Sequence, residues 1–311
     1  MPHGRRGRPS IVAAVKVGDR ALHELSERGF CVVEGFLTDE ELAQARQALW
    51  AQFPTPEAYA DDPGAHERLV RTQFAGNRRY PWVGWALNRL AFHPDLVDGV
   101  ERYLGSSDLQ LYKAELWAKY AGAVDYDQPQ HRDFGNHTIV VPHPDDAQAQ
   151  LTTFILLSDV TELDGPTMVV PLEHGRHVPM VPDAGEPGWW YSVPRGSFAD
   201  VEVPVVGPAG TLFVYRTDVF HRGSRFGAPG RARFTVLADY VRRGTPWAGK
   251  MAWPDVALSP HWVETMERAT VRERDLFGFP RPGDPYWSER TLADVQRRYP
   301  ALDLTPYAPS A

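Results

Sequence analysis

The chain has 311 residues, of which 43% are hydrophobic and 23% charged, and its formal net charge is -7. This composition is typical of a globular protein with a large core, and no apolar run is long enough to span a membrane. The negative charge excludes a broadly basic nucleic-acid surface, and we interpret the arginine-rich stretch MPHGRRGRP as a frayed tail.

The single cysteine, Cys31, rules out an internal disulfide, and the segment FCVVEGF around it predicts a buried strand. No apolar segment follows the first arginines, so we expect no secretory signal and a cytoplasmic protein. A small-molecule substrate is the partner that we expect, with no nucleic acid and no membrane.

The first third of the chain is predicted to be helical with one strand. RALHELSER (20–28) predicts a helix that ends at Gly29. Thr38 and Glu41 have the spacing of a capping box, so a second helix is expected over 38–53.

Residues 54–80 show no period and are expected to be irregular. The next helix is expected to begin at Pro94, because the first helical turn tolerates proline. His93 and Asp95 would flank this start, where the aspartate favours the positive end of the helix dipole.

The pattern changes to β from 108 to 241, where apolar or alternating runs rich in β-branched and aromatic residues are separated by Gly, Pro and Asp. The runs are LQLYKAELWAKYAG, AQLTTFILLSDV, GPTMVVPLEHG, FADVEVPVVGPAGTLFVYR and RARFTVLADYV. Many strands without helices between them predict a mainly β sandwich or jelly roll.

Helices are expected again near 258–275 and 290–298, after a segment rich in Trp and Pro. We therefore expect one domain over 1–311. It would consist of a helical N-terminal part (about 20–107), a jelly-roll core (108–241) and a C-terminal helical extension (242–311).

A histidine and an aspartate two positions apart, the spacing of a metal-binding pair, occur three times. The pairs are His93 with Asp95, His131 with Asp133, and His143 with Asp145. The first pair is assigned to a helix start, and the third lies in an acidic turn segment that favours a loop role.

The remaining pair lies in QHRDFGNH, which we interpret as a strand, so that His131 and Asp133 point to the same face. Another strand supplies His221, followed by Arg231 and Arg233. Two histidines and one carboxylate leave three adjacent metal positions open, as in non-haem Fe(II) oxygenases. An arginine nearby would bind a carboxylate in bidentate fashion.

In order and spacing, these segments resemble the phytanoyl-CoA dioxygenase family of Fe(II)- and 2-oxoglutarate-dependent oxygenases. The resemblance extends to about residue 241 and is carried by ERGFCVVEGFLTDEEL, QHRD, LSDVTELDGPTMVVPLEHG and PAGTLFVYRTDVFHRGS. It implies a double-stranded β-helix whose catalytic metal ligands are His131, Asp133 and His221. The implied cofactor is Fe(II), with 2-oxoglutarate and O2 as cosubstrates.

The reaction that the resemblance implies is hydroxylation of a small molecule with release of succinate and CO2. The substrate classes it suggests are a secondary metabolite, an acyl derivative or an amino-acid derivative. Two alternatives stay open: a cupin-like lyase or isomerase that uses a metal without oxygen chemistry, and a ligand-binding barrel without turnover.

The family usually has an arginine eleven positions after its second metal histidine. Here the run His221-Arg222-Gly223-Ser224 holds one extra residue, so the resemblance assigns 2-oxoglutarate to Arg233 and places the family's serine at Ser224. Arg231 is the alternative arginine, because some related oxygenases use a gap of ten. Lys119 matches a lysine that meets the cosubstrate or the substrate, and a surface lysine is the other interpretation.

Other residues are expected at or near the cavity wall. Phe154 and Thr153 lie on a strand that lines the pocket in this family, although core packing explains both. His137, six positions after His131, either borders the pocket or is a polar strand residue, and we favour the second interpretation. The segment GEPGWWYSVPRG, with Trp189 to Tyr191, either covers an apolar ligand or packs against the barrel.

Overall fold

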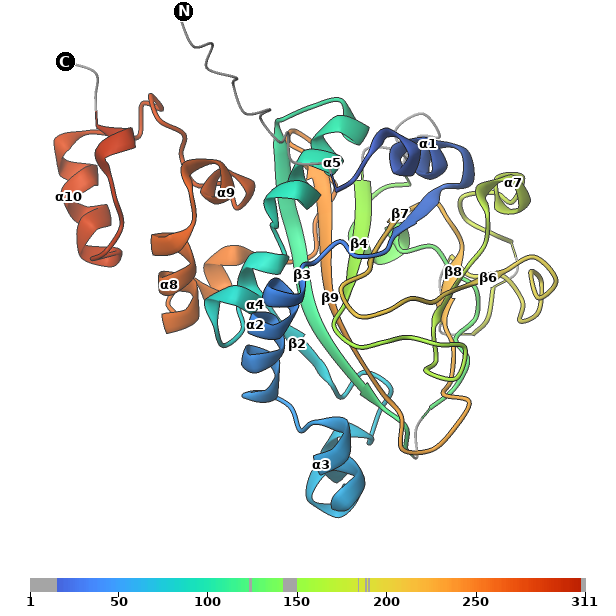
Figure 1. Ribbon diagram of the computed structural model, residues 1–311. Helices are drawn as coiled ribbons and strands as arrows, with labels where there is room; N and C mark the ends of the chain where they lie inside the picture. The colour runs from blue at the N-terminus through green and yellow to red at the C-terminus, as the bar shows by residue number, and fades with distance from the viewer. Residues whose placement is uncertain are drawn as a thin grey trace, which may run out of the picture.

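A computed structural model describes residues 16–122, 125–141, 150–183, 185–187, 189 and 191–308. Within these residues, two antiparallel sheets are flanked by helices (Figure 1). The larger sheet has the strand order β1-β7-β4-β9-β3-β2, and the smaller sheet has the order β6-β5-β8. The predicted fold, a mainly β jelly roll with flanking helices, is confirmed.

Every predicted β run contains a strand. The larger sheet consists of β1 (Phe30–Val33), β2 (Asn77–Arg79), β3 (Leu109–Tyr120), β4 (Gln150–Leu156), β7 (Leu212–Arg216) and β9 (Ala232–Arg242). The smaller sheet consists of β5 (Thr167–Val169), β6 (Val203–Val205) and β8 (His221–Gly223).

The helices lie mainly before β3 and after β9. Those before β3 are α1 (Asp19–Arg28), α2 (Asp39–Trp50), α3 (Pro56–Asp61), η1 (Pro63–Leu69), α4 (Trp85–Leu90) and α5 (Pro94–Leu104). The later ones are α6 (Phe134–His137), α7 (Leu172–Gly175), η3 (Trp253–Val256), α8 (Pro260–Arg268), α9 (Val271–Leu276), α10 (Glu289–Arg298) and η4 (Thr305–Tyr307). None of the described helices has the length and apolar character needed to cross a membrane.

Two expectations about where helices lie are wrong. Residues 54–80 are not irregular, because they contain α3, η1 and β2, and the β part of the chain is interrupted by α6 and α7. These four helices have only four to seven residues each. A helix of one or two turns is too short to leave a recognisable hydrophobic period in the sequence.

The two N-terminal helices are confirmed, and local interactions define their ends. Gly29 ends α1 in the left-handed conformation (φ 80°), and a Cβ there would lie 2.4 Å from a methyl carbon of Val219. Thr38 and Glu41 form the predicted capping box at the start of α2. This helix ends at Trp50, three residues before its predicted end.

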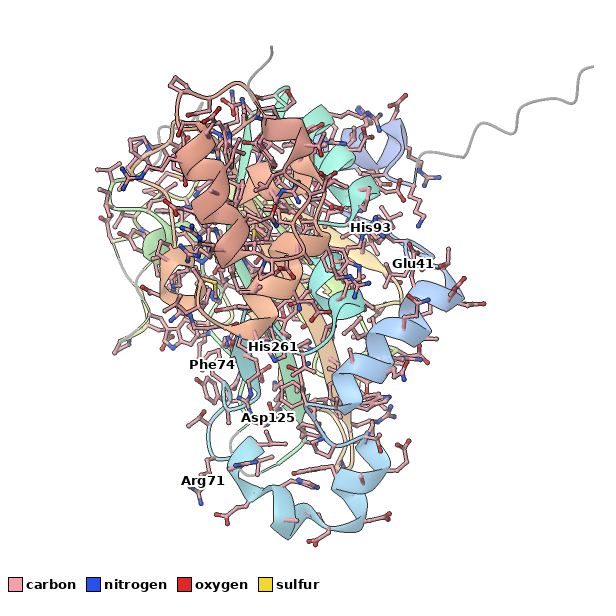
Figure 2. The ribbon with its side chains drawn as sticks, turned by 90° about the vertical axis from the view of Figure 1, so that its left-hand side faces the viewer. Glu41, Arg71, Phe74, His93, Asp125 and His261 are labelled. Atoms are coloured by element: carbon pink, nitrogen blue, oxygen red, sulfur yellow. The ribbon has the colours of Figure 1, made fainter. Side chains whose placement is uncertain are left out.

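The first His-x-Asp pair has a structural role, as the sequence indicates. His93 is the N-cap of α5, and its Nδ1 accepts the Asp95 N–H at 3.2 Å. Its Nε2 lies 2.9 Å from Glu41 Oε1 on α2, and the two residues are labelled close together in Figure 2. The contact between His93 and Glu41 therefore links α5 to α2.

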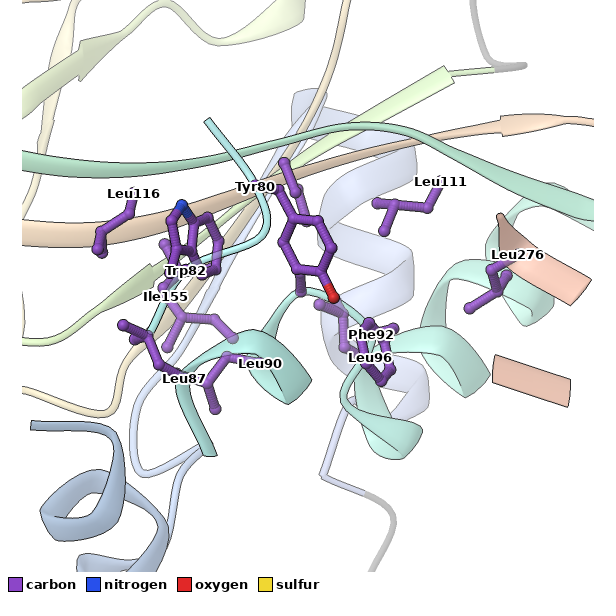
Figure 3. Packing of buried hydrophobic residues seen from close by; sticks show 14 of the residues in the cluster. Tyr80, Trp82, Leu87, Leu90, Phe92, Leu96, Leu111, Leu116, Ile155 and Leu276 are labelled. Carbon is purple, nitrogen blue, oxygen red and sulfur yellow. The ribbon is translucent and has the colours of Figure 1, made fainter. Parts of the chain in front are cut away.

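The main hydrophobic core lies between the larger sheet and the helices that cover one of its faces. Tyr80 and Trp82 are almost fully buried there, with ring centroids 5.2 Å apart, and Figure 3 shows them beside β3 among side chains that include Leu116 and Phe92. Alternate residues of a strand point to opposite faces. The residues on the other face of β3 and β9 therefore point away from this core and can line a site.

The predicted C-terminal helices are present as α8, α9 and α10, with one difference. The stretch expected near 258–275 is two helices, because Thr270 forms a capping box with Glu273 and starts α9. In Figure 1 these helices lie on the same side of the larger sheet as α4.

The capping box of α2 generates a stability prediction. Thr38→Ala should lower the free energy of unfolding by about 1 kcal/mol, because the Glu41 N–H loses its hydroxyl acceptor. Urea denaturation measures the change. Thr72→Ala is the control, since Thr72 is exposed and its side chain makes no hydrogen bond within the described residues. Equal effects of the two substitutions would contradict the assigned role of the cap.

Candidate metal centre

Three residues that the sequence singles out converge at one point of the barrel. His131, Asp133 and His221 each offer a ligand atom, and these atoms lie within 4.8 Å of one another. Asp133 Oδ2 is 3.4 Å from His221 Nε2, and Asp133 Oδ1 is 4.0 Å from His131 Nε2. Within the described part of the chain, no other group of three or more His, Cys, Asp or Glu residues has this arrangement.

The backbone brings these residues together differently from the predicted strand. His131 forms isolated antiparallel bridges with Ser192 and His221, and it exchanges two backbone hydrogen bonds of 3.0 Å with His221. Asp133 has helical dihedral angles (φ -73°, ψ -24°) and precedes α6. The predicted strand alternation is therefore not what brings the ligands together. The backbone bridge to His221 positions His131, and the start of α6 positions Asp133.

Both imidazoles are oriented by backbone carbonyls. His131 Nδ1 lies 2.8 Å from the Pro129 oxygen, and His221 Nδ1 lies 3.3 Å from the Val219 oxygen. A ring that donates its Nδ1–H to a carbonyl keeps the Nε2 lone pair available for a metal.

The charge states also suit a metal. Burial, together with His221, lowers the pKa of His131 to about 4, so this imidazole is neutral near pH 7. Burial alone would raise the pKa of Asp133, but His221, His137 and Lys113 hold it well below the ordinary range of a carboxyl group. Metal ligands must be deprotonated, and both residues meet this condition.

Arg132, between the first two candidate ligands, fixes the loop that carries them. Its side chain is buried and donates to the carbonyl oxygens of Asp218 at 2.8 Å, Gly175 at 3.0 Å and Pro179 at 2.7 Å. Its guanidinium carbon lies 4.0 Å from the centre of the Phe220 ring. Arg132 therefore ties the QHRD segment to the residues just before His221.

Tyr215 on β7 also belongs to the site and was not predicted. Its hydroxyl donates to Asp133 Oδ2 at 2.8 Å and lies 3.3 Å from His221 Nε2. Burial and the nearby Asp133 raise its pKa well above the ordinary value, so the phenol is neutral. Alternation within LFVYR gives Tyr215 a face but does not indicate that this face meets the metal ligands.

A cavity of about 620 Å³ opens beside the three candidate ligands, which is a typical volume for a small-molecule site. Its lining includes one face of β3 and β9: Lys113, Glu115, Trp117 and Lys119 from β3, and Arg233, Thr235 and Leu237 from β9. Lys113, Glu115 and Lys119 share one face of this long, largely buried strand, which was a visible signal of a polar site.

Two cations mark one end of this cavity. Lys119 and Arg233 are directly opposed in the pairing of β3 with β9. Lys119 Nζ lies 2.6 Å from Asp125 Oδ1, whereas Arg233 has no carboxylate within 4.0 Å in the described part of the chain and donates to the Gly165 carbonyl. Burial lowers the pKa of Arg233 to about 10 and also lowers that of Lys119. This end is suited to an anion.

Two other candidates for the cosubstrate, Arg231 and Ser224, are not part of the cavity wall. Arg231 precedes β9, is partly exposed, and pairs with Asp164 at 3.2 Å. The Ser224 hydroxyl donates to the Pro166 carbonyl at 2.6 Å, and Ser224 is not part of the cavity wall. Lys119 lines the cavity and is buried, so its interpretation as a surface lysine is wrong.

The extra residue after His221 has partners of its own. Arg222 Nη1 lies 2.7 Å from Asp127 Oδ1, and Arg222 Nη2 lies 2.6 Å from Glu202 Oε1. This ion-pair network binds β8 to two other segments, and Arg222 does not line the cavity.

The opposite end of the cavity holds a second buried ionic group. Lys113 Nζ lies 3.2 Å from Asp239 Oδ2 and 3.5 Å from Glu115 Oε2. Burial raises the pKa of Asp239 to about 6. His137 Nε2 is 3.5 Å from Lys113 Nζ. His137 borders the cavity, as one of its two interpretations expected, but it does so from α6 and not from a strand.

A segment after β9 completes this wall. Lys250 lines the cavity, and its Nζ donates to the Asn136 carbonyl at 3.3 Å. The backbone of the same segment is tied to the α6 region by hydrogen bonds from Gly249 N to His137 O and from Ile139 N to Trp247 O, both 2.9 Å long.

Aromatic residues from GEPGWWYSVPRG reach the site. The Trp189 and His131 rings are 4.9 Å apart, and the Tyr191 and Phe134 rings are 4.7 Å apart. Both Trp189 and Tyr191 line the cavity, which agrees with a cover over the site as well as with packing against the barrel. The segment's other tryptophan, Trp190, lies outside the described residues.

The remaining expectations have mixed outcomes. Phe154 lines the cavity, whereas the Thr153 hydroxyl donates to the Ala238 carbonyl at 2.8 Å within the sheet. The third His-x-Asp pair, His143 with Asp145, lies outside the described residues.

Comparison with known proteins identifies the relatives of this chain. The family model described as "Phytanoyl-CoA dioxygenase (PhyH)" matches residues 25–231. No curated protein sequence gives a significant match.

Solved structures share the fold at low identity. The epimerase SnoN, in complex with Fe3+, alpha ketoglutarate and nogalamycin RO, superposes with a TM-score of 0.54 at 19% identity, over 76% of this chain and 87% of SnoN. EvdMO1 gives a TM-score of 0.51 at 16% identity, over 74% of this chain and 50% of EvdMO1.

Arg132 gives a prediction for the loop that carries the candidate ligands. Arg132→Met should lower the free energy of unfolding by about 2 to 4 kcal/mol, because several buried carbonyl groups lose a charged donor. Guanidinium chloride denaturation of the metal-free protein measures the loss. Arg20→Met, at a highly exposed arginine, is the control and should change the value by less than about 0.5 kcal/mol. If Arg132→Met also lowered the free energy of unfolding by less than about 0.5 kcal/mol, the assigned role of Arg132 would be contradicted.

Proposed function

The chain belongs to the phytanoyl-CoA dioxygenase family of Fe(II)- and 2-oxoglutarate-dependent oxygenases, and from this premise we propose that it hydroxylates a small-molecule substrate. One observation carries the proposal: two imidazoles and one carboxylate meet beside a cavity whose end holds an arginine without a carboxylate partner in the described part of the chain.

The donor set fits Fe(II). His131, Asp133 and His221 would hold the metal, since two neutral imidazoles and one carboxylate are the ligands of non-haem iron oxygenases. When bound, Fe(II) with 2-oxoglutarate supplies an oxidation that releases succinate and CO2 while O2 provides the oxygen atom for a substrate C–H bond. The chain's own contribution is a neutral His131, an ionised Asp133, and two imidazoles that backbone carbonyls orient before the metal arrives.

Arg233 would bind the distal carboxylate of 2-oxoglutarate. A guanidinium binds a carboxylate through two parallel hydrogen bonds, and a buried cation without an acidic partner is costly until an anion arrives. Lys119, opposed to Arg233 across the strand pair, adds positive charge at the same end. The predicted contact of Ser224 with the cosubstrate has no support from the position of its hydroxyl.

The rest of the cavity would hold the substrate. Lys113, Glu115 and His137 present polar atoms at the end away from Arg233, and Trp117 and Trp189 present flat apolar surface. Such a wall suits a small molecule that carries both polar groups and an apolar body. Trp189, beside His131, would also limit the access of water to the reacting atoms.

We further infer that the helical N-terminal part, the jelly-roll core and the C-terminal extension form one domain. The inference is supported by the main hydrophobic core, in which buried residues such as Leu49, Leu116 and Leu276 belong to a single cluster. One continuous core is the usual mark of one domain.

The central experiment measures succinate formed from 2-oxoglutarate with Fe(II) and O2. The wild-type protein should form succinate. Asp133→Ala should reduce the rate by more than about a hundredfold, because the loss of a metal ligand should cost more than the roughly ten- to hundredfold that the loss of an outer-shell partner costs. Asp95→Ala is the matched control, since Asp95 has the same spacing to a histidine but lies at a helix start, and it should leave the rate unchanged.

Three outcomes would contradict the proposal. Equal losses for the two aspartate variants would show that the metal site has been assigned to the wrong pair. Turnover of a substrate under nitrogen, or with Zn²⁺ in place of Fe(II), would favour the lyase or isomerase alternative, because zinc has no redox chemistry. Fe(II) and 2-oxoglutarate binding without succinate formation would favour a ligand-binding barrel.

A second experiment decides between the two arginines. Arg233→Ala should raise the apparent KM for 2-oxoglutarate by about ten- to a hundredfold, since a hydrogen bond to a charged group contributes roughly 1.5 to 3 kcal/mol. Arg231→Ala should change the KM several-fold at most, because Arg231 pairs with Asp164 outside the cavity wall. Both constants are measured at saturating Fe(II), and the reverse ranking would contradict the assignment.

A further inference from the structure

The Tyr215 side chain lies directly behind the candidate metal ligands and is fully buried. Its ring lies 4.6 Å from the His221 ring and is stacked on Phe213 at 5.1 Å. A third aromatic ring, that of Phe154, lies 5.7 Å away. These apolar contacts need only a ring, and a phenylalanine would make them equally well.

The hydroxyl group therefore needs a separate explanation. A hydroxyl buried among aromatic rings is costly unless it forms a hydrogen bond. The Tyr215 hydroxyl lies 2.8 Å from Asp133 Oδ2 and 3.3 Å from His221 Nε2, both of which belong to the candidate ligand group.

The direction of the hydrogen bond follows from what each partner can accept. An ionised carboxylate only accepts hydrogen bonds, so the phenol is the donor to Asp133. A metal at the site would take the lone pair of His221 Nε2, after which Asp133 is the remaining acceptor of these two. The hydrogen bond to Asp133 is therefore the one that metal binding preserves.

We propose that Tyr215 is a positioning residue of the metal centre, whose hydroxyl fixes the rotation of the Asp133 carboxylate so that its free lone pairs face the two imidazoles. This inference rests on the proposed function, because it assumes that these three residues hold the metal. Without the hydroxyl, the carboxylate can turn about its Cβ–Cγ bond, and the metal must then order it on binding. Outer-shell partners of this kind typically contribute about ten- to a hundredfold to metal affinity.

The test uses Co(II), whose visible bands report coordination geometry, under anaerobic conditions and without substrate. Tyr215→Phe should weaken Co(II) affinity by about ten- to a hundredfold and shift the visible bands. Calorimetric titration gives the affinity, and the thermal midpoint of the metal-free protein shows whether the fold is kept. Tyr240→Phe is the matched control, since Tyr240 is equally buried and donates its hydroxyl to the Ala91 carbonyl, and it should leave affinity and bands unchanged.

Each outcome has a distinct meaning. A wild-type protein that binds no Co(II) would overturn the proposed function and this inference with it. Wild-type binding together with unchanged affinity and bands in Tyr215→Phe would overturn only the inference. If Tyr215→Phe does not fold, 3-fluorotyrosine at position 215 keeps the ring and the hydroxyl but makes a stronger donor. Shifted Co(II) bands in that protein would support the role of Tyr215, and unchanged bands would overturn it.

Discussion

The backbone pairing between His131 and His221 is the interaction on which the site depends. It joins two segments ninety positions apart in the chain through two hydrogen bonds, and it places the two imidazole rings 4.6 Å apart. Neither segment forms a long strand, so the pair cannot rely on an extended ladder for its stability. Arg132 reinforces the pairing, because it binds the Asp218 carbonyl and the Phe220 ring just before His221 and the Pro179 carbonyl in another loop.

The long strands β3 and β9 separate the apolar core, which stabilises the fold, from the cavity beside the candidate metal ligands. One face of each strand joins the apolar core, through residues such as Leu116 and Val236. The other face carries buried charges, including Lys113 with Asp239. Burying an ion pair costs more free energy than burying apolar side chains of similar size. The folding free energy gained by burying the apolar core on the opposite face of β3 and β9 must therefore offset the cost of burying these charges.

The sequence identifies the site better than it identifies the surrounding structure. His131, Asp133 and His221 were found because metal ligands require particular residue types, and their convergence in the structure supports that choice. The strand expected around Asp133 was wrong, because a pair of ligands two positions apart can be brought together by a helix start as well as by an extended chain. Residue spacing constrains the chemistry, whereas it leaves the local backbone undetermined.

Tyr215 and Lys250 could not be predicted, since their roles depend on tertiary contacts with distant residues. The position of Arg233 at the cavity wall could be predicted, because it follows from the family's spacing once the extra residue after His221 is counted. The same counting fails for short elements such as α3 and α6, which contain too few residues to show a period.

The wall segment around Lys250 lies beyond residue 231, where the match to the family model ends. Its backbone is nevertheless bonded to α6, next to the candidate ligand Asp133. The candidate ligand Asp133 and the segment that closes the far wall thus come from separate stretches of sequence that meet at α6. Evolution could exchange the later stretch for another of similar length and so present a different wall to the same oxidising centre. A chimeric protein built at this junction would inherit its reactivity from one parent and its selectivity in part from the other.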